Sequence, residues 1–137
     1  MNYPKINELT PVLVTDKMDE TIKYYQETMG FHLDFTWPNE GSATHAGFSI
    51  GPVTDGIHNE DDHVHFHLSL TDKKICNSGW LFINISEIDE LYKFYKNKMV
   101  NITIKLDDFP WGYREFEITD NNGHKFRFTK KLVHTSK

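Results

Sequence analysis

The sequence carries the same helical pattern of apolar residues twice, at an interval of 70 residues. In the first copy the residues that recur at helical spacing are Met18, Ile22, Tyr25 and Met29. In the second copy they are Ile88, Tyr92, Tyr95 and Met99. Such spacing places side chains on one face of an amphipathic helix. The pattern predicts helices over residues 16–29 and 86–99, produced by duplication of one structural unit.

Both predicted helices are bounded by residues that commonly cap helices. Asp16 and Ser86 are expected to cap the first turns, and each is followed by an aspartate three residues later. Gly30 and Asn101 tolerate the left-handed backbone conformation, so we expect them to end the two helices. The matching boundaries strengthen the case for a repeat.

Each predicted helix is flanked by segments typical of β-strands. The predicted strands cover residues 10–15, 31–37, 45–50 and 63–70 in the first half, and 80–85, 102–106, 113–119 and 125–130 in the second. The order β-α-β-β-β therefore occurs twice and predicts an α+β fold in one domain, residues 1–137. The two modules cover about residues 9–70 and 79–130, and a polar tail covers 131–137. Two unrelated halves and a single ferredoxin-like sheet are the alternatives.

Composition narrows the possible functions. The net charge of −5 disfavours a protein that tracks nucleic-acid phosphates, and aromatic residues, at 14%, are numerous enough to line a site for a flat ligand. The only cysteine, Cys76, lies in a predicted loop and is interpreted as an incidental thiol. No apolar run reaches the length of a membrane span, and the first residues lack the apolar segment of a signal peptide. We therefore expect a cytosolic protein with no nucleic-acid or membrane partner.

Residues 110–128, PWGYREFEITDNNGHKFRF, resemble a Trp-Gly-x-Arg-Glu-Phe … Asp-Pro-x-Gly-x-x-x-x-Phe signature. That signature belongs to the bleomycin-resistance branch of the vicinal oxygen chelate superfamily, which also includes glyoxalase I, extradiol dioxygenases and fosfomycin-resistance enzymes. Residues 11–16 and 29–31 are similar to the family's first strand and its Leu-Gly-Phe turn. Asn121 stands where the family usually has proline. The resemblance covers about residues 9–130.

The resemblance implies two tandem βαβββ modules whose curved mixed sheets surround a cleft. Because strand side chains alternate between faces, the sequence sorts residues between the core and this cleft. Val64, Phe66, Leu68 and Leu70 are expected to face the first helix, with His63 on the cleft side. The candidate ligand-binding residues are Trp37, His65, His67, Trp80, Phe82, Trp111, Tyr113, Glu115 and Arg127. The loops 39–44 and 51–62 are candidate lids. No catalytic residue is identified.

The metal-dependent relatives place histidine or glutamate at four points, on the first and last strand of each module. The corresponding positions here are Leu9 or Thr10, His67, Trp80 and Arg127. Of these residues only His67 is of a type that commonly binds metals, and the positive charge of Arg127 would repel a metal cation. Alternate histidines on one strand stand about 7 Å apart, so three in a line cannot share an ion and two can do so only with difficulty. We therefore expect no metal and no cofactor.

These features favour a metal-independent small-molecule-binding protein. By analogy with the bleomycin-resistance branch, it would act as a homodimer that sequesters an aromatic or cationic compound such as an antibiotic. One alternative is a metal-dependent lyase, isomerase, dioxygenase or thiol transferase of the same superfamily, with a displaced site built from His65, His67 and Glu115. Another is a regulatory module that binds a metabolite in the same cleft.

Overall fold

The structure is a computed structural model, and it describes residues 2, 4–54, 57–58, 63–77 and 79–133. The elements of the first half are β1 (Val12–Thr15), α1 (Met18–Lys23), the π-helix η1 (Tyr24–Thr28), β2 (His32–Trp37), β3 (His45–Ile50), β4 (Val53–Thr54), β5 (Ile57–His58) and β6 (Val64–Leu70). Those of the second half are β7 (Trp80–Asn84), α2 (Ile88–Asn97), β8 (Ile102–Phe109), β9 (Tyr113–Thr119) and β10 (Lys125–Lys131).

The two halves have the same sheet topology, which confirms the predicted duplication. The first sheet has the order β1-β6-β3-β2, and the second sheet has the order β7-β10-β9-β8. In each sheet the first strand of the module pairs parallel with its last strand, and the other neighbours are antiparallel. Strands β4 and β5 form a separate pair that the sequence did not predict. The observed architecture is thus the expected α+β fold of two tandem βαβββ modules.

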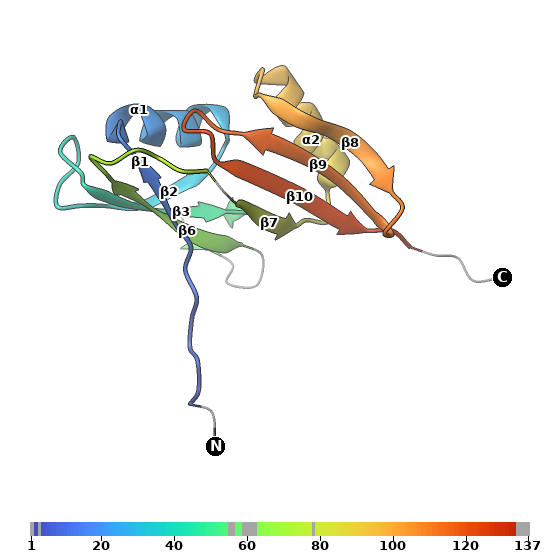
Figure 1. Cartoon of the computed structure of the whole chain (residues 1–137), viewed down its shortest axis with the longest axis horizontal. Coiled ribbons are helices and arrows are strands. Elements are labelled where there is room, and N and C mark those ends of the chain that lie inside the picture. The colour runs from blue at the N-terminus through green and yellow to red at the C-terminus, as the bar shows by residue number, and fades with distance from the viewer. Residues whose placement is uncertain (1, 3, 55–56, 59–62, 78, 134–137) are drawn as a thin grey trace.

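The helices cover one side of the sheets and leave the other side open. Figure 1 shows α1 above the first sheet and α2 behind the second, with the N-terminal residues running away from the body. The first helix changes from α to π geometry at Tyr24, and the backbone N–H of Phe31 bonds to the carbonyl of Tyr25 at 2.8 Å. This wider turn ends at Gly30, whose φ of 74° confirms the predicted left-handed position.

The predicted N-terminal caps, Asp16 and Ser86, were wrong. Lys17 and Glu87 occupy the N-cap positions, and neither makes a side-chain capping bond. Near the first helix, the hydroxyl of Thr15 instead accepts a hydrogen bond from the backbone N–H of Lys17 at 3.1 Å. Asn101 does not end the second helix either, because Met99 takes the left-handed conformation with a φ of 57°. At the 70-residue interval Met99 corresponds to Met29, so the left-handed residue after the helix comes one position earlier in the second module than in the first.

A single hydrophobic core joins the modules. The ring of Phe126, from β10, lies 6.2 Å from Tyr25, 5.6 Å from Phe31 and 5.9 Å from Phe66, all in the first module. Phe66 and Leu68 face this core as predicted, but Val64 and Leu70, at the ends of β6, are exposed. The shared core fixes the orientation of one sheet relative to the other.

Two buried tyrosines at equivalent positions brace the modules. The hydroxyl of Tyr25 donates to the Asp120 carboxylate, in the β9–β10 turn, at 2.5 Å. The hydroxyl of Tyr95 donates to the backbone carbonyl of Met29 at 3.1 Å. Burial, followed by the charge of Asp120, raises the pKa of Tyr25 well above its ordinary value, and burial also raises the pKa of Tyr95. Both phenols therefore remain protonated donors at neutral pH.

Candidate functional site

The open faces of the two sheets carry large aromatic side chains. Alternation along the strands points one set of residues into the core and the next set away from the helices. The exposed aromatic residues of these faces and their loops are Phe35, Trp37, Trp80, Phe82 and Trp111. Exposed rings gathered in this way are typical of a surface that binds a partner or a ligand.

The open face of the second sheet forms a depression of about 610 Å³. It is lined by Trp80, Phe82, Asn84, Trp111, Tyr113, Glu115, Arg127 and Thr129. All six candidate residues predicted for the second module lie here. The volume lies within the range of small-molecule sites, and the lining combines apolar rings with a few polar groups, as such sites commonly do.

A buried carboxylate organises this depression. Glu115 is only 2% exposed, and Arg127 donates from Nε to its Oε1 at 2.8 Å. Its Oε2 accepts from the Thr129 hydroxyl at 3.0 Å and, at a longer 3.3 Å, from the indole N–H of Trp111. A buried charge needs this kind of pairing to be tolerated. The arrangement holds Arg127 and Trp111 in place before any ligand arrives.

An aromatic stack supports the same charged group. Phe109, from β8, stacks on Trp111 with ring centres 4.8 Å apart, and the Arg127 guanidinium lies 5.5 Å from the Phe109 ring centre. Phe109 was not among the predicted site residues because the predicted strand ended at residue 106, whereas β8 continues to Phe109. Through Phe109 the longer β8 supports Trp111 and Arg127, which line the depression.

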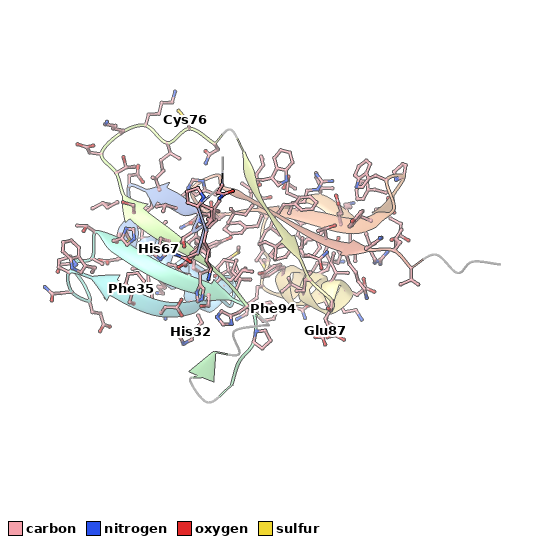
Figure 2. All side chains as sticks on the ribbon, turned by 90° about the horizontal axis from the view of Figure 1, so that it is seen from below. His32, Phe35, His67, Cys76, Glu87 and Phe94 are labelled. Carbon is pink, nitrogen blue, oxygen red and sulfur yellow. The ribbon has the colours of Figure 1, made fainter. Side chains whose placement is uncertain are left out.

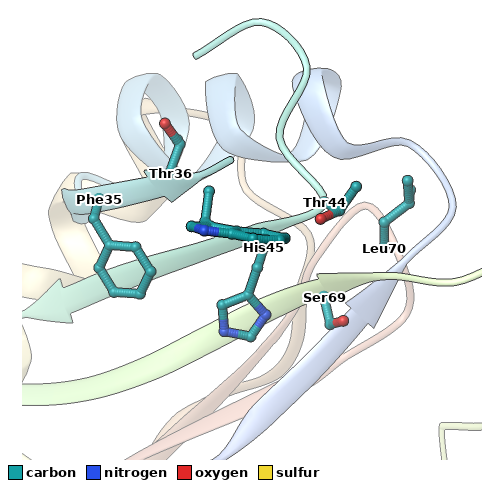
Figure 3. Close-up of a pocket in the computed structure, with 7 residues that line it drawn as sticks. Phe35, Thr36, Thr44, His45, Ser69 and Leu70 are labelled. Carbon is teal, nitrogen blue, oxygen red and sulfur yellow. The ribbon is translucent and has the colours of Figure 1, made fainter. Parts of the chain in front are cut away.

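The open face of the first sheet forms a second depression of about 570 Å³ (Figure 3). It is lined by Phe35, Thr36, Trp37, Thr44, His45, Ser69 and Leu70. Trp37 was predicted here, whereas Phe35 and His45 were not. Phe35 also lies beside His67 on the face opposite α1 (Figure 2), with ring centres 5.3 Å apart. Alternation within residues 45–50 could have placed His45 on this face.

His45 and His67 form a hydrogen-bonded pair on this face. Nε2 of His45 lies 2.9 Å from Nδ1 of His67, so one ring donates to the other. Burial lowers the pKa of His67, and the nearby His45 lowers it further. The lowered pKa favours the neutral form of the His67 ring at neutral pH.

A chain of polar contacts runs along the rest of the first sheet. Asp34 contacts Nδ1 of His32 at 2.9 Å and accepts from the Ser49 hydroxyl at 2.7 Å. Nδ1 of His65 lies 2.9 Å from the Ser49 oxygen, and Nε2 of His65 lies 3.1 Å from Nε2 of His63. In a nucleophilic triad the serine and the aspartate contact opposite nitrogens of the histidine ring. Here Ser49 is fully buried, and both Ser49 and Asp34 contact Nδ1 of His65, so the group is not such a triad.

The last contact corrects one expectation. The strand rise separates the backbones of alternate histidines, but the rings of His63 and His65 fold toward each other until their nitrogens nearly touch. Side-chain torsions therefore bring the two rings to hydrogen-bond distance, closer than the strand rise alone implied, while the expectation about a shared ion stays a prediction.

The structure does not assemble the displaced metal site. His65 and His67 belong to the first sheet, whereas Glu115 belongs to the second and is paired with Arg127. Among the residues that the structure describes, no three histidine, cysteine, aspartate or glutamate side chains converge in a way that could hold a metal ion. At the family's ligand positions, Leu9 lies exposed before β1 and Trp80 begins β7. The expected absence of a metal remains a prediction.

Other predicted features lie away from the two depressions or outside the described chain. Cys76 is exposed in the segment that joins the modules, as its predicted loop position implied. In the candidate lid 39–44, Thr44 lines the first-sheet depression. Of the candidate lid 51–62, residues 55–56 and 59–62 lie outside the described residues. Within the described part of the chain, no helix has the length and hydropathy needed to cross a bilayer.

The comparisons with known proteins agree with this architecture. The family model described as "Glyoxalase/Bleomycin resistance protein/Dioxygenase superfamily" matches residues 5–128. No curated protein matches the chain. Three similar solved structures are a glyoxalase-related enzyme from Clostridium phytofermentans, TioX from Micromonospora sp. ML1, and the bleomycin-binding protein of Streptomyces verticillus with copper(II)-bleomycin.

These structures share the fold at low sequence identity. The Clostridium protein has a TM-score of 0.75 at 24% identity, covering 94% of this chain and 98% of its own. TioX has a TM-score of 0.67 at 21% identity, with coverages of 95% and 100%. The bleomycin-binding protein has a TM-score of 0.66 at 20% identity, with coverages of 96% and 100%. With the family match over most of its length, the chain belongs to the glyoxalase/bleomycin resistance protein/dioxygenase superfamily.

Proposed function

We propose that the protein binds a flat, partly aromatic small molecule on its open sheet faces and does so without a metal ion. The observation that carries this proposal is the depression of the second sheet, where exposed indole rings surround a preorganised Arg127–Glu115 pair. Aromatic rings there offer stacking surfaces, and the fixed charge pair offers direction for polar groups of the ligand.

We further propose that two copies pair, with the first sheet of one copy facing the second sheet of the other. Phe35 and Trp37 on the first sheet and Trp80 and Phe82 on the second are large exposed rings, and such rings on open sheet faces favour a surface that is covered by a partner. Pairing would cover both faces and turn two shallow depressions into enclosed clefts.

The ligand class is proposed from charge and from one relative. The bleomycin-binding protein of similar fold binds bleomycin, according to its name. The net charge of −5 on this chain favours neutral or cationic compounds over anionic ones. We therefore propose an aromatic or cationic compound such as an antibiotic, held in a cytosolic protein whose lone cysteine forms no internal disulfide.

Binding to a panel of aromatic cations and metal-free bleomycin tests the proposal. Calorimetric titration is expected to show saturable binding that EDTA leaves unchanged and that Trp80→Ala or Trp111→Ala weakens at least tenfold. Phe94→Leu is a matched control, because Phe94 is an exposed ring on α2 that does not line the depression. Equal loss in the control, or binding abolished by EDTA, would contradict the proposed mode.

Light scattering tests the pairing separately. The full chain is expected to have twice the mass of one copy, and Phe82→Glu, which places a charge on the open face, is expected to shift it toward the monomer. A wild-type monomer at concentrations of tens of micromolar would overturn the paired arrangement but leave ligand binding on one face open to the calorimetric test.

A further inference from the structure

The Arg127 guanidinium in the second-sheet depression has N–H groups that no described protein atom accepts. Its side chain is 14% exposed, and its Nε donates to Oε1 of Glu115 at 2.8 Å. A guanidinium carries five N–H groups, so four remain on the two Nη atoms. These four make no hydrogen bond to another residue in the described part of the chain. Donors with so little access to water are normally paired, and the Nη atoms therefore suit an acceptor on a ligand.

The protein fixes the position of these donors before a ligand arrives. Glu115 holds the Nε edge of the guanidinium, and the ring centre of Phe109 lies 5.5 Å from Cζ of Arg127. Phe109 is itself stacked on Trp111, with ring centres 4.8 Å apart. A guanidinium is planar and rigid, so contacts at one edge and one face also set where its Nη groups lie. Because Arg127 and Trp111 both line the depression, the donors lie beside an exposed indole ring.

Cationic ligands meet no free carboxylate among the described residues that line the depression. Glu115 is the only carboxylate in that lining. Its Oε1 accepts from Arg127, and its Oε2 accepts from Thr129 and Trp111. A ligand ammonium would have to displace these donors from a side chain that is 2% exposed. The lining therefore favours a ligand that accepts hydrogen bonds over one that brings a positive charge.

The charges on this part of the open face are balanced. Residues two apart along a strand share a face, so Glu117 lies on the side of Glu115, and Lys125 lies on the side of Arg127. Arg127 and Glu117 are opposite each other in the β9–β10 register. Glu117 is 7% exposed and accepts from the Thr103 hydroxyl at 2.6 Å. These two negative and two positive formal charges cancel, and a neutral ligand preserves the balance, whereas a ligand carboxylate would not.

We propose that the second-sheet depression selects neutral, planar aromatic compounds with a carbonyl oxygen, and that Arg127 is the residue that determines this specificity. The carbonyl oxygen accepts from the Nη groups of Arg127, while the rings of the ligand pack against the exposed rings of Trp80 and Trp111. The inference rests on the proposed function and deepens it, because it narrows an aromatic or cationic ligand to an aromatic hydrogen-bond acceptor.

Fluorescence titration of the full chain with acridone and with 9-aminoacridine tests this selectivity. Both probes have the same fused three-ring frame, but acridone is neutral with a carbonyl oxygen, whereas 9-aminoacridine is a cation at neutral pH. Acridone is expected to bind at least about tenfold more tightly, because a hydrogen bond to a charged donor is lost with the other probe. The net charge of −5 attracts the cation, so long-range attraction works against the expected result. Equal affinities, or tighter binding of 9-aminoacridine, would overturn the proposal.

Substitutions at Arg127 test its role. The double variant Glu115→Gln/Arg127→Met removes both charges together, so neither is left buried without its partner. Arg127→Lys keeps a positive charge beside Glu115 but lacks the two Nη groups. Both variants are expected to lower the affinity for acridone about tenfold, the size of one hydrogen bond to a charged donor. A preference for acridone that survives in both variants would overturn the role of Arg127.

Arg114→Met is the matched control. Arg114 pairs with Asp89 and Asp108 at 2.8 Å and does not line the depression, so this variant is expected to keep the wild-type preference. Circular dichroism checks that each variant is folded. An equal loss of preference in the control would remove the assignment to Arg127.

The outcomes separate this inference from the proposed function. Trp80→Ala removes a stacking surface and is expected to weaken the binding of both probes. Equal binding of the two probes, weakened alike by Trp80→Ala, would overturn the carbonyl preference and leave the proposed aromatic site in place. Binding of neither probe would overturn the inference, and it would overturn the proposed function as well if the calorimetric panel also showed no binding.

Discussion

Replacing Tyr25 with phenylalanine should destabilise the protein more than replacing its repeat partner Tyr95. Both side chains are buried, and both substitutions remove only a hydroxyl group. The Tyr25 hydroxyl donates to the Asp120 carboxylate, whereas the Tyr95 hydroxyl donates to an uncharged carbonyl. The structural repeat thus supplies two nearly equivalent sites that differ in the charge of the acceptor.

The expected magnitudes follow from those acceptors. A hydrogen bond to a charged group contributes about 1.5–3 kcal/mol, and one between neutral groups about 0.5–1.5 kcal/mol. In Tyr25→Phe the Oδ2 atom of Asp120, a residue only 6% exposed, loses its partner, while Oδ1 keeps the backbone N–H groups of Asn122 and His124 at 2.9 and 2.8 Å. We expect a loss of about 2.5 kcal/mol for Tyr25→Phe and about 1 kcal/mol for Tyr95→Phe.

Urea unfolding followed by circular dichroism measures both losses. Protein concentration must be the same throughout, because pairing of copies would make stability depend on it. With a slope of about 2 kcal/mol per molar urea, the two midpoints should fall by about 1.2 and 0.5 M. Equal losses, or a larger loss for Tyr95→Phe, would refute the reasoning. The double variant Tyr25→Phe/Asp120→Asn should lose less than the sum of its single changes.

Three further outcomes are expected. The free energy of unfolding should fall as pH rises above 10, because the unfolded chain then releases phenolic protons that Tyr25 and Tyr95, with their raised pKa values, keep in the folded protein. The slope approaches about 1.4 kcal/mol per pH unit for each tyrosine. Each Tyr→Phe variant should lower that slope by about 1.4 kcal/mol per pH unit in alkaline urea titrations. Gly47→Ala should weaken ligand binding and lower the melting temperature only slightly, because the new methyl group would overlap the exposed Phe35 ring. Fluorescence titration measures the affinity, and thermal unfolding measures the stability. Glu115→Gln should cost about 1.5–3 kcal/mol in urea unfolding, because the guanidinium paired with it loses its charged partner.

The duplication and the two faces of each strand were predictable from local patterns. The 70-residue interval located both helices, and strand alternation placed Trp80, Phe82 and Arg127 in one depression. Strands β3 and β9 have the predicted bounds, because turn-forming residues mark both ends of each.

Contacts between distant segments were not predictable. Thr15, rather than Asp16, bonds to the start of the first helix, since tertiary packing decides which nearby oxygen reaches the free N–H group. The burial of Glu115 depends on Arg127 from the neighbouring strand, and the approach of His63 to His65 depends on side-chain torsions. Periodicity carries no information about either.

The parallel pairing within each module offers a place where the chain can be divided. β1 closes on β6, and β7 closes on β10, so each sheet is complete on its own side of residues 71–77. A nick between Lys73 and Lys74 would yield two fragments that keep all their strands. The second fragment would carry Phe126, whose ring packs on Tyr25 and Phe31 of the first fragment. Reassembly of the fragments would follow mass action, which makes the protein a candidate for a split reporter.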